Sequence, residues 1–274
     1  MKNQLILFDT IPSWIIILMP ILLISGPFLS DLGVTIITII FLINSFKNKL
    51  YKYYTNYYFI LFFILCLIFI ISSLLSDNIL ISLKNSLFYF RFGIFSLCFW
   101  YLLERNQFLI RRLFFSILLC YISLIIDGYF QFFNGKNLFG FALHDQYRVS
   151  SFFGSELILG SYLARFFPIL FGLFIIFDKT KKNKAILFLV TIIFILSEGL
   201  IFISGERLAL FFMNLSAIYI IFMIKEYKIY RLWTYIASIC LIVILMFSFP
   251  NAKDRIIDQT INDFTRQNHS NKEE

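Results

Sequence analysis

The feature that most constrains this chain is a succession of long apolar segments separated by short polar ones. An α-helix needs about 20 residues to cross the roughly 30 Å hydrocarbon core of a bilayer, and it satisfies its backbone hydrogen bonds internally, as lipid requires. The segments come close to this length. About nine transmembrane helices are predicted, over residues 13–29, 32–46, 57–75, 80–103, 113–133, 155–177, 185–203, 208–224 and 232–249.

Composition supports the same fold class. Hydrophobic residues make up 60% of the 274 residues, charged residues only 15%, and the mean hydropathy is +0.84. A soluble domain of this size could not bury so much apolar surface around one core. We therefore predict an all-α, polytopic membrane protein with a transmembrane domain over 1–249 and the start of an external loop over 250–274. A tight turn at residues 30–33 is expected between the first two spans.

The basic residues indicate the orientation of the chain. Threading the spans alternately gathers most of them on one side, and the positive-inside rule makes that side cytoplasmic. The N-terminus is then cytoplasmic and the C-terminal tail lies outside. The basic residues in question are Lys2, Lys47, Lys49, Lys52, Arg105, Arg111, Arg112, Lys179, Lys181, Lys182, Lys184, Lys225, Lys228 and Arg231.

Several classes of function do not fit the sequence. The net charge of +8 comes from clusters between spans, so no basic face for nucleic acid remains. The four cysteines lie in apolar runs without metal-ligand spacing, so neither a metal site nor a disulfide is expected. The motifs G-x-G-x-x-G, G-x-x-x-x-G-K-[ST] and H-E-x-x-H do not occur, which argues against nucleotide-driven transport and zinc proteolysis.

Charged residues at membrane depth mark candidate functional positions, because each costs about 2.5–3.5 kcal/mol to insert. Most of them fall in the outer half of the predicted bilayer, which predicts a polar cavity that opens outwards. Lys84 and Arg91 are expected on one face of the fourth span. The other candidates are Asp127, Glu156, Glu198, Glu206 and Arg207.

A structural interpretation of these charges is also open. Intramembrane charges commonly survive as ion pairs, here Arg91 with Asp127 or Glu198, and Glu206 with Arg165 or a neighbour. Arg207 differs, because it lies in a glycine-containing turn between two spans, where a guanidinium can bind phosphate oxygens with two hydrogen bonds. In the external loop, His144 and Asp145 could be a catalytic pair, but adjacent residues rarely face each other, which favours a solvated histidine.

Three ordered motifs resemble the bacterial O-antigen ligase and O-antigen polymerase family. They are D-G-x-x-Q-x-x-x-G-x-N-L-F-G-F at 127–141, R-V-S-x-F-F-G-x-E-L-I-L-G-S-Y-L-x-R-x-x-P at 148–168 and I-S-G-E-R-L-A-L at 203–210. The helix K-N-S-L-F-Y-F-R-F at 84–92 is also similar to one of that family. The resemblance covers about residues 57–260.

The resemblance implies an integral glycosyltransferase of the bacterial inner membrane. The donor would be a glycan linked to undecaprenyl diphosphate, and the acceptor a hydroxyl of lipid A core or of another lipid-linked glycan, at the periplasmic face. No cofactor is implied. Arg207 would hold the diphosphate, together with Arg91 and Arg255, while Glu156 would order the cavity or the acceptor and Arg148 would shape the external loop.

The chain departs from the family near its end. Members of the family continue into a long periplasmic loop with a catalytic histidine, followed by further spans. Here N-A-K-D-R-I-I-D-Q-T at 251–260 resembles the start of that loop, and the sequence stops at Glu274. His269 is a candidate for the missing base, although its surroundings lack the family's motif, and the chain is expected to be a fragment or one half of a split protein.

Two alternatives remain open from the sequence. The chain could be a subunit of a transporter or flippase for lipid-linked oligosaccharides, although such proteins usually have internal repeats and binding groups at the midplane. It could also be an inactive, truncated relic of the ligase family.

Overall fold

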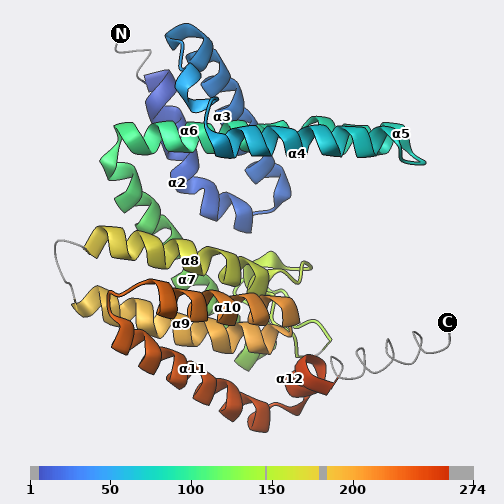
Figure 1. The fold of residues 1–274 in the computed structure, drawn as a ribbon. Coiled ribbons are helices and arrows are strands. Elements are labelled where there is room, and N and C mark those ends of the chain that lie inside the picture. The colour runs from blue at the N-terminus through green and yellow to red at the C-terminus, as the bar shows by residue number, and fades with distance from the viewer. Residues whose placement is uncertain (1–5, 146, 179–183, 259–274) are drawn as a thin grey trace. The chain divides into compact units, whose positions relative to one another are not determined.

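The structure is a computed structural model that describes residues 6–145, 147–178 and 184–258 (Figure 1). Every regular element in these ranges is helical, and β-structure is limited to two isolated bridges, Lys136 with Ala142 and His144 with Arg148. The chain divides into two compact units, Met1–Ser116 and Ile117–Glu274.

The first unit contains α2, α3 and α6 packed together, and α4 packed against α5 and α6. The division between the units falls within α7, Gln107–Asn134. The elements before α7 are η1 (Ile6–Thr10), α2 (Ile11–Ile24), α3 (Pro27–Asn48), η2 (Tyr51–Tyr53), α4 (Tyr57–Leu74), α5 (Ile79–Leu87) and α6 (Phe90–Arg105).

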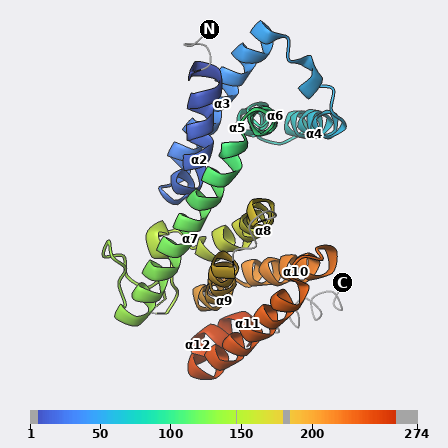
Figure 2. The same cartoon turned by 90° about the vertical axis from the view of Figure 1, so that its left-hand side faces the viewer.

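In the second unit, α9 packs against α8, α10 and α11 (Figure 1, Figure 2). Its interior is formed by buried apolar side chains such as Leu163, Phe167 and Phe194. The elements are η3 (Ser151–Phe153), α8 (Leu159–Asp178), α9 (Lys184–Ser204), α10 (Arg207–Met223), α11 (Lys228–Ser248), α12 (Pro250–Lys253) and η4 (Asp254–Asp258).

Seven of the described helices are long and apolar enough to cross a bilayer, and two shorter apolar helices, Phe8–Ile24 and Arg207–Met223, lie among them. Many large apolar side chains on these helices point outwards; Phe28, for example, is 74% exposed and Phe247 86%. Such surfaces are stable only against lipid or a partner. The protein is therefore a multi-pass membrane protein, and the helices occur where the sequence predicted spans.

Two predicted boundaries were wrong, and one predicted span, within Ile79–Arg105, contains a short turn. The first turn lies at Ser25–Gly26 rather than at residues 30–33, because Gly26 has a φ of 122° and Pro27 then begins α3. The predicted fourth span is interrupted by a turn at Phe88 and Tyr89. The predicted sixth span begins at Leu159, not at residue 155.

The turn between α5 and α6 is held by contacts with α4. The Tyr89 ring stacks on Phe62 with centroids 6.0 Å apart and meets the edge of Phe69 at 5.2 Å. The hydroxyls of Ser73 and Ser86 are hydrogen-bonded at 3.0 Å. The turn lies between Lys84, which is exposed on α5, and Arg91 on α6, so the two residues belong to different helical segments.

Candidate functional site

The loop between α7 and α8 is held by two side chains at the end of α7. Gln131 Oε1 accepts hydrogen bonds from the backbone N–H groups of Ser150 and Ser151, at 3.0 and 2.7 Å. Its Nε2 donates to the carbonyls of Phe141 and Ala142. Gln131 is completely buried, so its amide replaces water for four backbone groups of the loop.

Asp127, one helical turn before Gln131, binds the same loop. Its carboxylate accepts from the Ser151 hydroxyl at 2.7 Å, from the Leu138 N–H at 3.0 Å and from the Asn137 amide at 3.4 Å. Asn137 in turn donates to the Ser151 carbonyl at 2.9 Å. Asp127 was predicted as a group in a polar cavity; its contacts here are those of a loop anchor.

This anchored loop positions Arg148. The residue pairs with His144 across an antiparallel bridge, and its side chain is 6% exposed. Arg148 Nε donates to the carbonyl of Ser204, the last residue of α9, at 3.0 Å. An orphan carbonyl at the end of a helix thus binds a cation, as the helix dipole favours.

A second arginine binds the next carbonyl of the same turn. Arg255 Nε donates to Gly205 O at 3.2 Å. Gly205 has a φ of 71°, and a Cβ at this position would lie 2.8 Å from Arg255 Cδ and 3.4 Å from Arg148 Nε. Only glycine lets both side chains approach the turn so closely. Arg207 follows in the chain as the first residue of α10.

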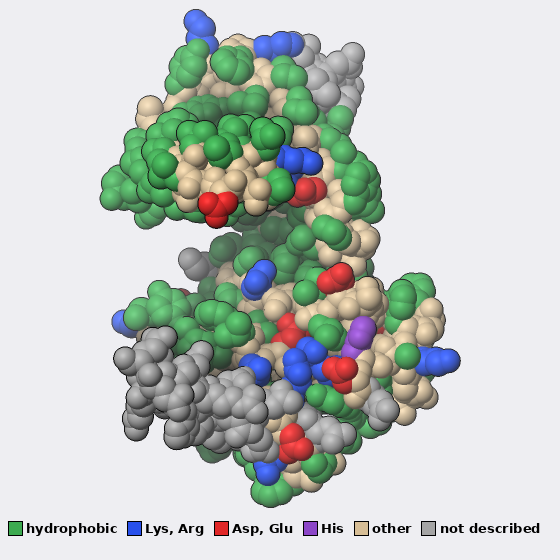
Figure 3. All heavy atoms as spheres, turned by 90° about the vertical axis from the view of Figure 1, so that its right-hand side faces the viewer, with side chains coloured by type: hydrophobic (Ala, Val, Ile, Leu, Met, Phe, Trp, Pro, Cys, Tyr) green, Lys and Arg blue, Asp and Glu red, His purple; other side chains and the backbone are tan. Residues whose placement is uncertain are grey.

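Arg148 and Arg255, which bind the Ser204–Arg207 turn, and Arg207, which is the last residue of that turn in the chain, are called the arginine cluster below. Figure 3 shows basic and acidic side chains gathered on the face of the molecule at this end of the helices. The pKa of Arg148 is lowered, first by burial and then by the positive charge of Arg255. Both effects disfavour the cation, so an anion bound here would be stabilised.

Glu206 joins the same turn to the start of α8. Its carboxylate accepts from the N–H groups of Gly160 and Ser161, at 2.6 and 2.8 Å, and from the Ser161 hydroxyl at 2.7 Å. These N–H groups have no partner within the helix, and the positive end of the helix dipole attracts a carboxylate. A Cβ at Gly160 would lie 3.1 Å from the Glu206 carboxylate, so the glycine makes room for the contact.

The remaining predicted residues take other positions. Glu156 is exposed in the loop just before α8. His144 Nε2 lies 2.9 Å from the Gly154 carbonyl, and the neighbouring Asp145 is exposed. Glu198 is completely buried within α9. His269 lies outside the described residues.

The ion pairs suggested for Arg91 were wrong. Arg91 binds Asp31 at 2.7 Å, a residue that the sequence analysis did not single out. Glu206 binds the start of α8, as described above, and Arg165 is exposed. Sequence reasoning also missed the roles of Gln131, Asn137, Ser151 and Ser161. The spacing of Asp127 and Gln131 could have indicated that both point from one helical face, but not what they bind.

In the described ranges, no three side chains of His, Cys, Asp or Glu lie close enough together to hold a metal ion.

No family model, curated protein or solved structure matches this chain. The chemistry of the Ser204–Arg207 turn is therefore the basis for a function. The guanidinium groups of Arg148 and Arg255 lie beside the end of α9, at one end of the apolar helices of the second unit.

Proposed function

We propose that the chain is a membrane glycosyltransferase of the O-antigen ligase and polymerase type. It would transfer a glycan from undecaprenyl diphosphate to a sugar hydroxyl at the periplasmic face of the bacterial inner membrane. The acceptor would be lipid A core or another lipid-linked glycan. The proposal combines the motif resemblance with the position and chemistry of the arginine cluster.

The proposal rests mainly on one observation: Arg148 and Arg255 both bind the turn between α9 and α10, and Arg207 is the last residue of this turn. Their bonds to Ser204 and Gly205 use the Nε atoms and orient both guanidinium planes. Two like charges held together on one turn repel, and a diphosphate would offset this repulsion with several charge-assisted hydrogen bonds. A lipid-linked diphosphate also needs its binding site at the end of membrane helices.

The same groups suit the chemistry of transfer. When the acceptor hydroxyl attacks the sugar, the bond to the diphosphate breaks and negative charge grows on the leaving group. Guanidinium groups already in place stabilise that charge without reorganisation. Glu156, which is exposed beside α8, would order the acceptor, and His269 is the candidate for the base that takes the hydroxyl proton.

The test is transfer of a labelled glycan from its undecaprenyl diphosphate donor in membranes that contain the protein. Arg207→Ala is expected to lower the rate about a hundredfold or more, as loss of one stabilising donor does elsewhere. Arg148→Gln and Arg255→Gln should also lower it. Lys253→Gln, at an exposed lysine of α12, is the matched control and should leave it unchanged.

Insertion and amount of each variant are measured in the same membranes. Unchanged transfer by a normally inserted Arg207→Ala variant would remove Arg207 from the site. Transport of the lipid-linked glycan without transfer, by the unaltered protein, would favour the flippase alternative and contradict the proposal.

A further inference from the structure

The loop between α7 and α8 folds back along α7, and its residues 138–141 are called the loop tip below. The N–H of Leu138 donates to the Asp127 carboxylate at 3.0 Å, and the Asn137 amide donates to the same carboxylate at 3.4 Å. The interval from Asp127 to Asn134, the last residue of α7, corresponds to about 10 Å of helix at a rise of about 1.5 Å per residue. The loop tip therefore lies beside a helix long enough to cross a membrane, and not beyond its end (Figure 2).

All four backbone N–H groups of the loop tip are hydrogen-bonded within the protein. Besides that of Leu138, the N–H groups of Phe139 and Phe141 donate to Asn137 Oδ1, at 3.0 and 2.8 Å, and the N–H of Gly140 donates to the Asn137 carbonyl at 3.0 Å. A segment that enters lipid needs such internal partners, because no water is present to accept from its N–H groups.

The carbonyl groups of the loop tip limit how deeply it can enter. No described residue donates to the carbonyls of Leu138, Phe139 or Gly140. A carbonyl without a donor is costly in hydrocarbon, whereas water and headgroups can donate to it at the membrane surface. The backbone of the loop tip is therefore suited to the boundary between headgroups and hydrocarbon.

The side chains of the loop tip are apolar and largely uncovered. Leu138 is 61% exposed, Phe139 74% and Phe141 45%. The Phe139 ring meets Phe152 edge to face with centroids 5.2 Å apart, and a Cβ at Gly154 would lie 3.2 Å from the Phe141 ring. These contacts hold the two rings in place but leave much of their surface free. Such an apolar patch indicates contact with lipid or with a partner.

The exposed patch is continuous with the lipid-facing side of α7. Ile126, Phe130 and Phe133 recur at intervals of four and three residues, so they lie on one helical face, and all three are exposed. Asp127, which binds the loop tip, follows Ile126 and lies about 100° further around the helix. The apolar face of α7 and the loop tip are therefore neighbours, and lipid that covers one can cover the other.

We infer that the loop tip is inserted into the membrane interface, with the side chains of Leu138, Phe139 and Phe141 among the lipids. Apolar side chains of this kind enter the boundary between headgroups and acyl chains in interfacial segments. A second protein fits less well, because the loop tip has no free N–H group and no polar side chain for the hydrogen bonds of a protein interface. The inference concerns the loop alone, so it does not depend on the proposed glycosyl transfer.

The test attaches a nitroxide spin label at Phe139→Cys in the full-length protein, in a background without the four native cysteines, reconstituted in phospholipid vesicles. Relaxation of the label by oxygen, which concentrates in lipid, is compared with relaxation by a water-soluble nickel complex. The ratio of the oxygen effect to the nickel effect should be several times higher for Phe139→Cys than for Lys136→Cys. Lys136, an exposed and charged residue of the same loop, is the matched control.

A second variant keeps the native cysteines and tests the inference if the spin-labelled protein fails to fold. The fluorescence that Phe139→Trp adds to that of Trp14, Trp100 and Trp233 should be quenched by lipids with brominated acyl chains and not by aqueous iodide. Lys136→Trp should show the reverse. An oxygen-to-nickel ratio at residue 139 no higher than at residue 136 would place the loop tip in water. Weak effects of both reagents at residue 139 would mean that protein covers it. Either result would overturn the inference.

Discussion

At the residue scale, Glu206 connects two segments that the chain brings together only through folding. Its carboxylate binds the first N–H groups of α8 while its backbone forms the turn before α10. The glycine at position 160 lets the two meet. The geometry of the Ser204–Arg207 turn, and with it the arginine cluster, therefore depends on one carboxylate.

Replacing that carboxylate by an amide should loosen the turn. In Glu206→Gln, an NH₂ group faces a backbone N–H and cannot accept from it, so the protein is expected to lose about 1–3 kcal/mol of stability. Thermal unfolding in detergent should show a midpoint lower by several degrees. Glu226→Gln, at an exposed glutamate, serves as control. Equal midpoints for both variants would mean that the Glu206 contacts add no stability.

Glu198, unlike Glu206, is a carboxylate that is not expected to stabilise the fold. It is completely buried, and no hydrogen bond of normal geometry reaches either carboxylate oxygen from the described residues, although the buried Ser238 side chain of α11 lies close enough to interact with it. Replacement of such a group by an apolar one of similar shape is expected to be neutral or to stabilise by about 1–3 kcal/mol. Glu198→Met should thus raise the unfolding midpoint or leave it unchanged, with Glu226→Gln, at an exposed glutamate, as the control. A clear loss of stability would show that the carboxylate has a partner in the membrane.

At the element scale, the loop between α7 and α8 is organised by the end of α7 rather than by its own sequence. Gln131→Leu would leave the N–H groups of Ser150 and Ser151 without an acceptor. Each orphaned group costs about 1–3 kcal/mol, so hydrogen exchange in residues 135–154 should accelerate about tenfold or more. Asn134→Ala, at an exposed position of the same helix end, should leave the exchange unchanged.

The Gln131→Leu variant also tests whether the loop between α7 and α8 positions the arginine cluster. Because Arg148 reaches Ser204 from this loop, Gln131→Leu should also reduce the rate of glycan transfer while Asn134→Ala should not. Slow exchange in the Gln131→Leu variant would contradict the anchoring role of Gln131, whatever its effect on transfer.

At the scale of the whole molecule, the order of the helices is compatible with alternate crossings of the membrane. The orientation predicted from the basic loops is tested by labelling with an impermeant maleimide in spheroplasts. In a background without the four native cysteines, Lys136→Cys should react in intact spheroplasts, and Lys228→Cys only after they are opened. The reverse pattern would invert the topology and place the arginine cluster in the cytoplasm, which would contradict the proposed function.

The apolar pattern of the sequence was sufficient to predict that the protein is helical, roughly where its helices lie and that it crosses the membrane several times. These properties depend on the length of each apolar segment. In the lipid no water is present to form hydrogen bonds with the backbone, so an apolar segment long enough to cross the bilayer forms a helix. The sequence also marked Glu206 and Arg207 as candidates through their position between spans, and Arg148 and Arg255 through the resemblance to the ligase family.

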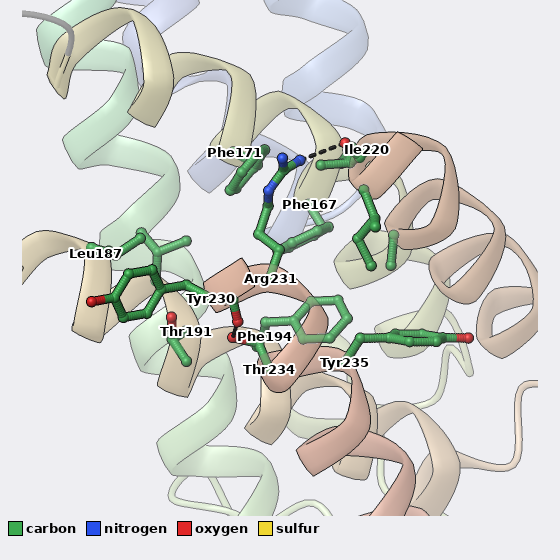
Figure 4. Close-up of a pocket in the computed structure, with 13 residues that line it drawn as sticks. Phe167, Phe171, Leu187, Thr191, Phe194, Ile220, Tyr230, Arg231, Thr234 and Tyr235 are labelled. Atoms are coloured by element: carbon green, nitrogen blue, oxygen red, sulfur yellow. Dashed lines mark hydrogen bonds between the residues drawn. The ribbon is translucent and has the colours of Figure 1, made fainter. Parts of the chain in front are cut away.

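The partner of each charged side chain could be identified only in the folded structure. Arg91 forms an ion pair with Asp31, Asp127 binds the loop between α7 and α8, and Glu206 binds the first N–H groups of α8. Arg231, which the sequence analysis counted only as a basic residue of a loop, lies buried in an apolar pocket between α8, α9, α10 and α11 (Figure 4). A charged side chain has a high free-energy cost at membrane depth, so it needs a partner that offsets this cost. Which group becomes the partner depends on which helices pack together, and the spacing of residues along the chain does not reveal this.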